Sequence, residues 1–171
     1  MAGAGDSAME GRVRVGVVEG LTYPLPRGLA GVLAGVARIL VAGGVGHAQA
    51  LVELERIAPV TAVVTHREFL AFGDRLPESA RLDLDGTRVY LTHLVGTPHE
   101  PLPPIRALLE SDAPDVIAHG HRPRADVVWV GGTLFVCPGL VVPQKPGQPG
   151  TCVLLDIEGP GRITAHVVEI P

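Results

Sequence analysis

Histidines stand at the ends of three apolar stretches of this sequence. His66 ends PVTAVVTH, His93 ends RVYLTH, and His119 and His121 flank the glycine that follows PDVIA. Side chains alternate between the two faces of a strand, so His119 and His121 can point the same way. Neutral imidazole binds transition metals, and open α/β sheets bind ligands at the carboxyl ends of their strands. These histidines are therefore the main functional signal of the chain.

The elements that would position these histidines follow from the spacing of apolar residues. In the first half, β-branched runs alternate with segments of helical spacing. Strands are predicted at 12–18, 38–44 and 60–64, and helices at 29–37 and 45–57. This β-α-β-α-β order implies a parallel sheet with right-handed crossovers.

The second half of the sequence changes to hairpins, which the glycine turns indicate. The predicted elements, in order, are a hairpin about Asp85-Gly86, a helix at 101–111, a strand at 114–118, a hairpin about Gly131-Gly132, and a hairpin of 151–157 with 162–170. Parallel units followed by antiparallel hairpins predict two sheets packed face to face, with helices outside. The fold class is therefore α/β.

Composition excludes several classes of protein. The chain has 171 residues, 46% of them hydrophobic and 19% charged, which indicates one domain at 12–171 behind a short tail at 1–11. A net charge of -4 argues against a nucleic-acid binder, which needs a basic face. No signal segment and no apolar run of membrane-spanning length are found. Cys137 and Cys152 are too few for a disulfide framework, so a cytoplasmic protein is expected.

Six blocks of the sequence together resemble the calcineurin-like metallophosphoesterase superfamily. They are VRVGVV, LVAGG, PVTAVVTHRE, RVYLTH, DVIAHGH and GGTLFVCPG, and they extend over the chain from residue 13 onward. The similarity is greatest to small bacterial and archaeal phosphodiesterases and to the retromer subunit that shares their fold. It implies a four-layer α/β/β/α sandwich of two mixed sheets flanked by helices. It also implies two metal ions at the strand ends, which clamp a phosphate and activate a bridging water.

Several positions that bind metal in this family do not hold the family's ligands here. The family's Asp-x-His falls on Gly20 and Thr22, and its Gly-Asp falls on Gly43 and Gly44. Its last histidine falls on Pro123. Without a carboxylate at position 44, two cations in one cleft would repel each other with nothing between them. The resemblance therefore predicts a degenerate member in which the two-metal phosphodiesterase reaction is absent or nearly so.

Other positions keep side chains that could bind a cation. His93 and His121 match retained histidines, and His66 takes the place of a metal-binding asparagine. Together they predict one divalent transition metal, which could be zinc, manganese, nickel or iron; the alternative is hydrogen-bonded histidines with no metal. For Glu19 and Glu68, a role as base stands beside that of a solvated carboxylate. The residues expected to line the cleft are Glu19, Gly20, Gly44, Glu68 and His119.

Two classes of function follow from this pattern. In the first, the chain keeps the phosphoesterase scaffold as a binding or assembly module for an unknown protein partner or a second copy of itself. In the second, it is a metal-dependent phosphoesterase or other hydrolase with a remodelled single-metal site at the three histidines. Proline and apolar residues in the loops 19–28 and 141–150 favour a protein contact, although prolines also stiffen loops. The first class is preferred.

Overall fold

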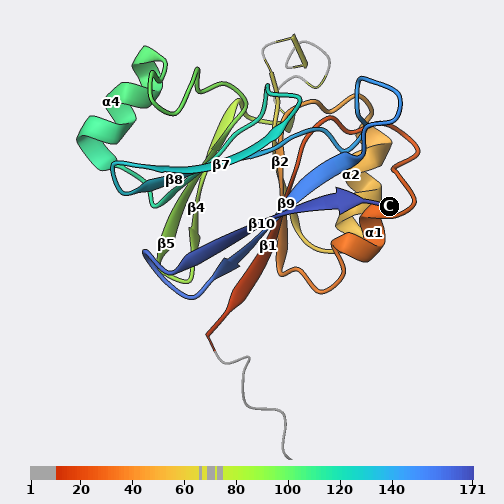
Figure 1. Ribbon diagram of the computed structural model, residues 1–171, viewed down its shortest axis with the longest axis horizontal. Coiled ribbons are helices and arrows are strands. Elements are labelled where there is room, and N and C mark those ends of the chain that lie inside the picture. Colours follow the sequence, from red (N-terminus) through yellow and green to blue (C-terminus); the bar gives the residue numbers. More distant parts are fainter. Residues whose placement is uncertain (1–10, 66, 69–71, 73–74) are drawn as a thin grey trace, which may run out of the picture.

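The structure is a computed structural model that describes residues 11–171 except 66, 69–71, 73 and 74. Its strands form two five-stranded sheets that pack face to face (Figure 1). The first sheet holds, in spatial order, β10 (Ile163–Ile170), β9 (Gly150–Ile157), β1 (Val13–Val18), β2 (Arg38–Ala42) and β3 (Val60–Val63). The second sheet holds β4 (Ser79–Leu84), β5 (Thr87–Thr92), β6 (Val116–Ala118), β8 (Thr133–Pro138) and β7 (Ala125–Val130).

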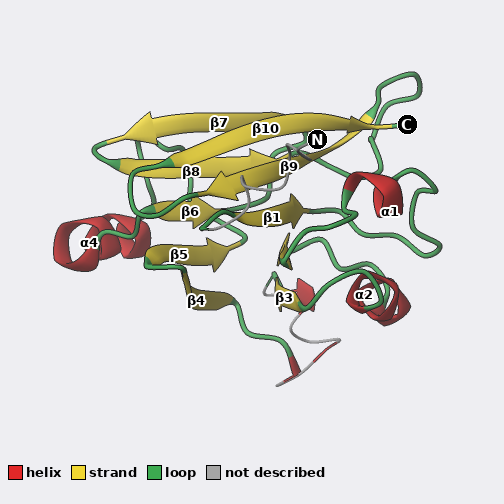
Figure 2. Cartoon of the chain, turned by 90° about the horizontal axis from the view of Figure 1, so that it is seen from below, coloured by secondary structure: helices red, strands yellow, loops and turns green. Residues whose placement is uncertain are grey.

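Helices cover the outer faces of both sheets, so the layers run helix, sheet, sheet, helix (Figure 2). α1 (Leu29–Val32) and α2 (Ala48–Glu55) pack on the first sheet, and α4 (Pro103–Asp112) packs on the second. The predicted α/β/β/α sandwich of two mixed sheets is confirmed. Among the helices of the described chain, none is long and apolar enough to cross a membrane.

The core between the two sheets is built from aliphatic side chains, as the low aromatic content of 4% requires. The strands β1 and β2 lie between the second sheet and the outer helices, so residues 15–18 and 39–42 are buried on both faces and are apolar. The fully buried side chains of this core include Val15, Val17, Leu40, Val63, Leu91, Val116, Ala118, Val136, Val153, Leu155 and Ile157.

Parallel pairing brings the candidate residues to one edge of the sandwich. β1 pairs in parallel with β2 and β2 with β3, while β6 pairs in parallel with both β5 and β8. The loops that follow β1, β2, β3, β5, β6 and β8 therefore leave from the carboxyl ends of these strands, where α/β sheets bind ligands. We call this set of loops the cleft edge.

Local signals placed most elements correctly, but both helices predicted in the first half are too long: the helix predicted at 45–57 is α2, Ala48–Glu55. Asp85 and Gly86 have φ angles of 54° and 78°, and both glycines of the predicted turn after β7 also have positive φ, as tight hairpin turns require. The helix predicted at 29–37 ends at Val32. Gly35 follows with a φ of 77°, a left-handed conformation that terminates helices.

Candidate functional site

Loops of the cleft edge meet around one buried carboxyl group. Glu19, which directly follows β1, is 3% exposed. Its Oε1 accepts a hydrogen bond of 2.7 Å from the backbone N–H of His121, in the loop after β6. The neighbouring Gly120 donates its N–H to the carbonyl oxygen of His93, after β5, at 3.1 Å. The bond from His121 to Glu19 joins the first sheet to the second, and the bond from Gly120 to His93 ties together two strand ends of the second sheet.

The surroundings of Glu19 favour its protonated form at neutral pH. Burial raises the pKa of this carboxyl group to about 8; the hydrogen bond from His121 opposes the rise, and the charge of Glu68 adds to it. Within the described residues, its Oε2 atom is buried and has no hydrogen-bond partner. A protonated carboxyl group can donate a hydrogen bond, whereas binding a cation requires the ionised form.

His93 is buried beside this carboxyl group and is also held neutral. Its Nδ1 lies 2.8 Å from the carbonyl oxygen of Ala42, which can only accept, so Nδ1 carries the hydrogen. Burial lowers the pKa of His93. The same Nδ1 lies 3.5 Å from Glu19 Oε1. Because burial shifts both groups toward their neutral forms, this contact is not an ion pair, and Nε2 is left as the nitrogen without a hydrogen.

His119 and His121 lie in different surroundings, contrary to the alternation expected of an extended strand. β6 ends at Ala118, and His121 has a φ of 72°, so the strand pattern does not continue through the two histidines. His119 is buried, with its ring edge-on to Phe135, and burial lowers its pKa to about 4. The His121 side chain is exposed, and its ring meets that of His93 edge-on at 5.3 Å between centroids.

Main chain fills the space beside Gly44, where the resemblance places a carboxylate. Leu21 donates its N–H to the Gly44 carbonyl oxygen at 2.7 Å, and Gly46 donates to the Leu21 carbonyl oxygen at 3.0 Å. A Cβ atom on Gly44 would lie 2.6 Å from Gly20 N and 2.8 Å from Gly20 Cα, closer than real side chains come to main chain. Gly44 also has a φ of 69°, which favours glycine. An aspartate would therefore require the loop after β1 to move.

Glu68 forms a local contact at the end of β3. Its Oε2 accepts the N–H of Thr65 at 2.8 Å, and its own N–H donates to Thr65 Oγ1 at 3.2 Å. This reciprocal pair is the capping box found at helix N-termini. His66, between them in sequence, lies outside the described residues. The three-histidine site of His66, His93 and His121 therefore stays a prediction.

Of two residues that shape the site through their backbone, Gly120 was visible in the sequence as the glycine between His119 and His121, but Ala42 was not. Ala42 sets the tautomer of His93 through its carbonyl oxygen, and Gly120 allows close approach of the two sheets. A Cβ on Gly120 would collide with that same carbonyl oxygen and would lie 2.6 Å from the Glu19 Cδ. Backbone groups leave no side-chain signature, so only the glycine at the end of the strand signalled this close approach.

Tested against a two-metal centre, the side chains present do not fit. Gly20 and Gly44 offer no side-chain donor, and Oε1 of Glu19 already accepts the backbone N–H of His121. The nearby Cys137 is buried, and burial raises the pKa of its thiol to about 11, so it is no thiolate ligand. Among the residues that the structure describes, no group of three or more His, Cys, Asp or Glu side chains is arranged to hold a metal ion. The cluster instead joins the two sheets through neutral hydrogen-bonding groups.

A groove of about 330 Å³ opens next to His93. Its walls come from the end of β3, from β5 and from the start of α4. Apart from His93, the lining residues are Val64, Thr65, Glu78, Ser79, Tyr90, Thr92, Leu94, Leu102, Pro104 and Ile105. Leu94 and Leu102 are exposed at its rim. The groove is therefore a mixed surface on the cleft edge, with exposed apolar side chains at its rim and both polar and apolar side chains in its walls.

Solved structures share this fold at low sequence identity. The D62A variant of Vps29 from Entamoeba histolytica superposes with a TM-score of 0.69 at 16% identity, covering 93% of this chain and 100% of that one. Vps29 of Chaetomium thermophilum in complex with a cyclic peptide gives 0.67 at 16%, covering 93% and 96%. A predicted phosphoesterase from Streptococcus pneumoniae gives 0.62 at 14%, covering 92% and 98%. These likenesses show the fold alone.

Sequence comparison identifies the family. No curated protein sequence matches the chain. Residues 22–160 do match the calcineurin-like phosphoesterase superfamily domain. The match begins within the loop after β1 and ends in the turn between β9 and β10, so it includes the residues that follow β2, β3, β5, β6 and β8. The chain therefore belongs to the calcineurin-like phosphoesterase superfamily.

Proposed function

We propose that this chain is a non-catalytic member of its metal-dependent superfamily and works as a binding or assembly module. The contact between Gly20 and Gly44 carries the proposal, because main chain stands where the family's bridging carboxylate would lie. Two-metal hydrolysis needs negative charge between two cations ~3.5–4 Å apart. Here the nearest buried carboxyl group, Glu19, is held protonated.

Exposed apolar side chains at the cleft edge support the binding role. Four of the seven large hydrophobic side chains that are exposed in the described chain lie there: Tyr23, Leu94, Leu102 and Val142. Tyr23 and Val142 belong to the loops 19–28 and 141–150, and Leu94 and Leu102 border the groove beside His93. Apolar groups gathered on one face mark contact sites for other proteins. We place the protein contact at this edge.

Hydrolysis of bis-p-nitrophenyl phosphate tests the absence of catalysis. The purified chain is assayed with manganese, nickel or zinc added, beside an active metallophosphoesterase as control. We expect no turnover above the metal-only background. A rate near the ~1–10³ s⁻¹ of ordinary enzymes would overturn the proposal.

Paired surface variants test the binding role. The double variant Tyr23→Ser with Leu94→Ser removes two exposed side chains of the cleft edge, and Val52→Ser removes an equally exposed one from α2. Leu25→Ser is less suitable, because Leu25 is partly buried against the outer core. We expect the double variant alone to lose proteins that cross-link to the wild-type chain. Equal capture by all three chains would contradict a contact at this edge.

The second candidate function is a hydrolase with one divalent metal, which could be zinc, manganese, nickel or iron. One observation favours it. The Nδ1–H of His93 on the Ala42 carbonyl is the arrangement that leaves Nε2 as a metal ligand, and the His121 ring lies against this histidine. His66 would be the third ligand. A bound metal would supply Lewis acidity at an open coordination position.

Calorimetric titration with zinc separates the two candidates without an activity assay. A metal site predicts tight binding that is lost in His93→Ala and His121→Ala, and that weakens as pH falls through the histidine range near ~6.5. His166→Ala, which alters an exposed histidine on β10, serves as the control. The binding-module proposal predicts no difference among the four chains.

A further inference from the structure

β10 forms one outer edge of the first sheet. It pairs with β9 over all eight of its residues, from Ile163 opposite Ile157 to Ile170 opposite Gly150. Within the part of the chain that the structure describes, no strand pairs with its other side. The backbone N–H and C=O groups on that side point outward and are a template for another strand.

This edge has few of the features that usually keep edge strands from pairing, the exception being the charged Glu169 in the same row as Val167. The strand ITAHVVEI contains no proline, lysine or arginine, and its register with β9 runs without a bulge. Its one acidic residue, Glu169, lies next to the end of the strand. Natural proteins protect long free edges by such features or cover them. β10 has the properties of an edge that is covered.

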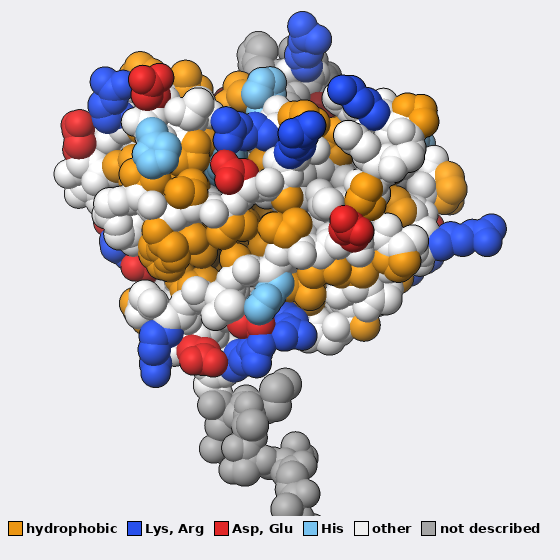
Figure 3. Space-filling view, viewed as in Figure 1, with side chains coloured by type: hydrophobic (Ala, Val, Ile, Leu, Met, Phe, Trp, Pro, Cys, Tyr) orange, Lys and Arg blue, Asp and Glu red, His pale blue; other side chains and the backbone are white. Residues whose placement is uncertain are grey.

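An open strip of the inter-sheet core lies beside this edge. β7, the edge of the second sheet, is on the same face (Figures 1 and 2), and hydrophobic side chains gather across the middle of that face (Figure 3). Val167 on β10 is 51% exposed, and Trp129 on β7 is 47% exposed. Alternation places Val167 in one row with Ala165, and Trp129 in one row with Val127, which both pack on the inter-sheet core.

We infer that a second copy of this chain covers the edge, with the two β10 strands antiparallel across a two-fold axis at Ala165. Ile163 then faces Val167 of the other copy, Thr164 faces His166, and Ala165 faces its own counterpart. Opposite residues of an antiparallel pair point to the same side, so apolar row meets apolar row and polar row meets polar row. The interface does not use the cleft edge and is independent of the proposed function.

Charge selects this register over the neighbouring one. With the axis at Ala165, Glu169 lies beyond the apolar row, opposite Gly161 and next to Arg162 of the other copy. An axis at His166 would instead set Glu169 opposite Ile163 and the two His166 rings opposite each other. Arg162 of the other copy lies one position from Glu169 in both registers, so the difference is that the first register keeps the Glu169 carboxylate away from Ile163 and the two His166 rings apart.

The size of a stable dimer explains why Trp129 belongs to the interface. Stable complexes bury ~800 Å² on each partner, more than a short strand pair provides. A copy related by a two-fold axis perpendicular to the first sheet brings its second sheet to the same side, opposite β7. The exposed rows that end at Val167 and Trp129 are then covered together.

Symmetric cross-linking tests the interface. In the full-length chain, Ala165→Cys places one thiol opposite its counterpart, at the spacing of a cross-strand pair. His166→Cys is the matched control, because position 166 faces position 164. The native thiols of Cys137 and Cys152 are buried with raised pKa values and do not compete. Under mild oxidation we expect most of the Ala165→Cys chain, and little of the His166→Cys chain, to form a covalent dimer.

Light scattering of reduced protein is the second measurement. We expect a dimer for the wild type and for Val52→Lys, and a monomer with unchanged circular dichroism for Val167→Lys, since an inward-pointing charge blocks edge pairing. A monomeric wild type at the cross-linking concentration would overturn the proposal, even if it bound a strand-forming peptide. So would a dimer that persists in Val167→Lys, or a cross-link through His166→Cys in place of Ala165→Cys.

Discussion

Glu19 accepts the His121 N–H across the two sheets while burial raises its pKa from an ordinary 4.5 to about 8. Because the folded-state pKa is the higher one, the stability tied to this group is fully present below pH 4.5 and is lost as pH rises through 8. The pKa of His119 shifts in the opposite direction: burial lowers it from an ordinary 6.5 to about 4 in the folded state. Its contribution is present above pH 6.5 and is lost as pH falls through 4.

Between pH 6.5 and 8 the free energy of unfolding should therefore fall as Glu19 ionises. The slope approaches ~1.36 kcal/mol per pH unit, or about 2 kcal/mol over this window. Glu19→Gln keeps an acceptor for His121 and should flatten the dependence, while Glu55→Gln on exposed α2 should keep it. Urea denaturation across the window measures both. A flat wild-type profile would contradict the raised pKa.

Substitutions at Gly44 and Gly131 compare two costs of adding a side chain: a strained backbone conformation, and steric contact with neighbouring main chain. Both have positive φ, but only a side chain on Gly44 would meet main chain, and one on Gly131 would meet nothing within 4 Å. Gly131→Asp should lower the free energy of unfolding by about 1 kcal/mol. Gly44→Asp, which restores the family's carboxylate, should lower it by about 3 kcal/mol or more. Equal effects in chemical denaturation would mean that the loop after β1 yields easily.

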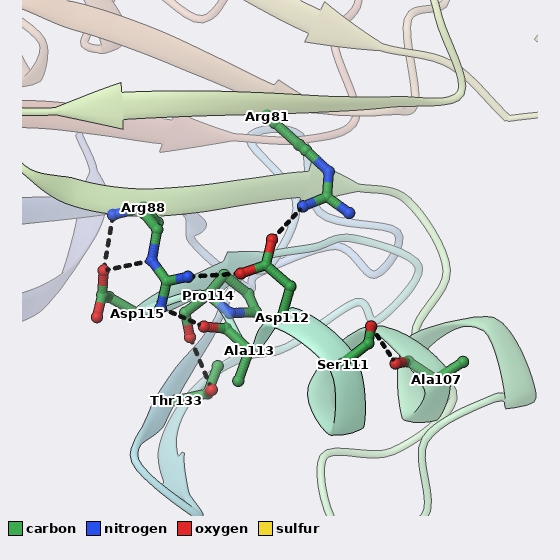
Figure 4. A network of polar contacts seen from close by, with 9 residues as sticks. All are labelled: Arg81, Arg88, Ala107, Ser111, Asp112, Ala113, Pro114, Asp115 and Thr133. Carbon is green, nitrogen blue, oxygen red and sulfur yellow. Dashed lines mark hydrogen bonds and ion pairs between the residues drawn. The ribbon is translucent and has the colours of Figure 1, made fainter.

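At the scale of elements, arginines tie the C-terminal end of α4 to the β4–β5 hairpin (Figure 4). Arg88 donates to Asp112 Oδ1 at 2.7 Å and to the Ala113 carbonyl oxygen at 2.6 Å, and its backbone N–H donates to Asp115 at 2.7 Å. Arg81 donates to the other Asp112 oxygen at 3.0 Å. Cations beside the last turn of a helix also oppose the negative end of its dipole.

Arg88→Ala should lower the free energy of unfolding by about 1 kcal/mol, mainly through the lost bond to the helix-end carbonyl. The ion pairs themselves add little, because both arginines and Asp112 are about half exposed. Arg81→Ala is the matched control, with an expected loss of ~0.3 kcal/mol. Urea denaturation at low and high salt measures both losses. If both variants lost the same free energy of unfolding, the stabilisation would come from the bonds to Asp112 and not from the bond of Arg88 to the Ala113 carbonyl oxygen.

At the scale of the whole molecule, the two sheets meet through an aliphatic core and neutral contacts at the strand ends. This packing predicts that chelation with EDTA, followed by added zinc, leaves the melting temperature unchanged. A ligand at 100 times its Kd would stabilise the folded state by ~2.7 kcal/mol, which a thermal scan detects. A rise with zinc in the wild type that disappears in His93→Ala would instead support the single-metal alternative.

Elements defined by short-range rules could be predicted from the sequence. The turns at Asp85-Gly86 and Gly131-Gly132 need positive φ angles, and the glycines in the sequence predict such turns. The first three strands are buried toward their carboxyl ends, where they appear as short apolar runs. The order of sequence blocks then identified the family, and with it the four layers. His93 and His121 were expected together, and their rings do meet.

Long-range packing decided the rest. The last hairpin joins the first sheet because Val13 pairs with Ile157, far along the chain, and this pairing makes β10 an edge. The pKa of Glu19 depends on burial between loops from both sheets, and the contact of Gly20 with Gly44 depends on how two loops cross. By itself, the sequence determined which segments become strands and which ligands are missing. Only the tertiary structure decided what occupies the place of the missing ligands, because burial and close approach depend on residues that are distant in the sequence.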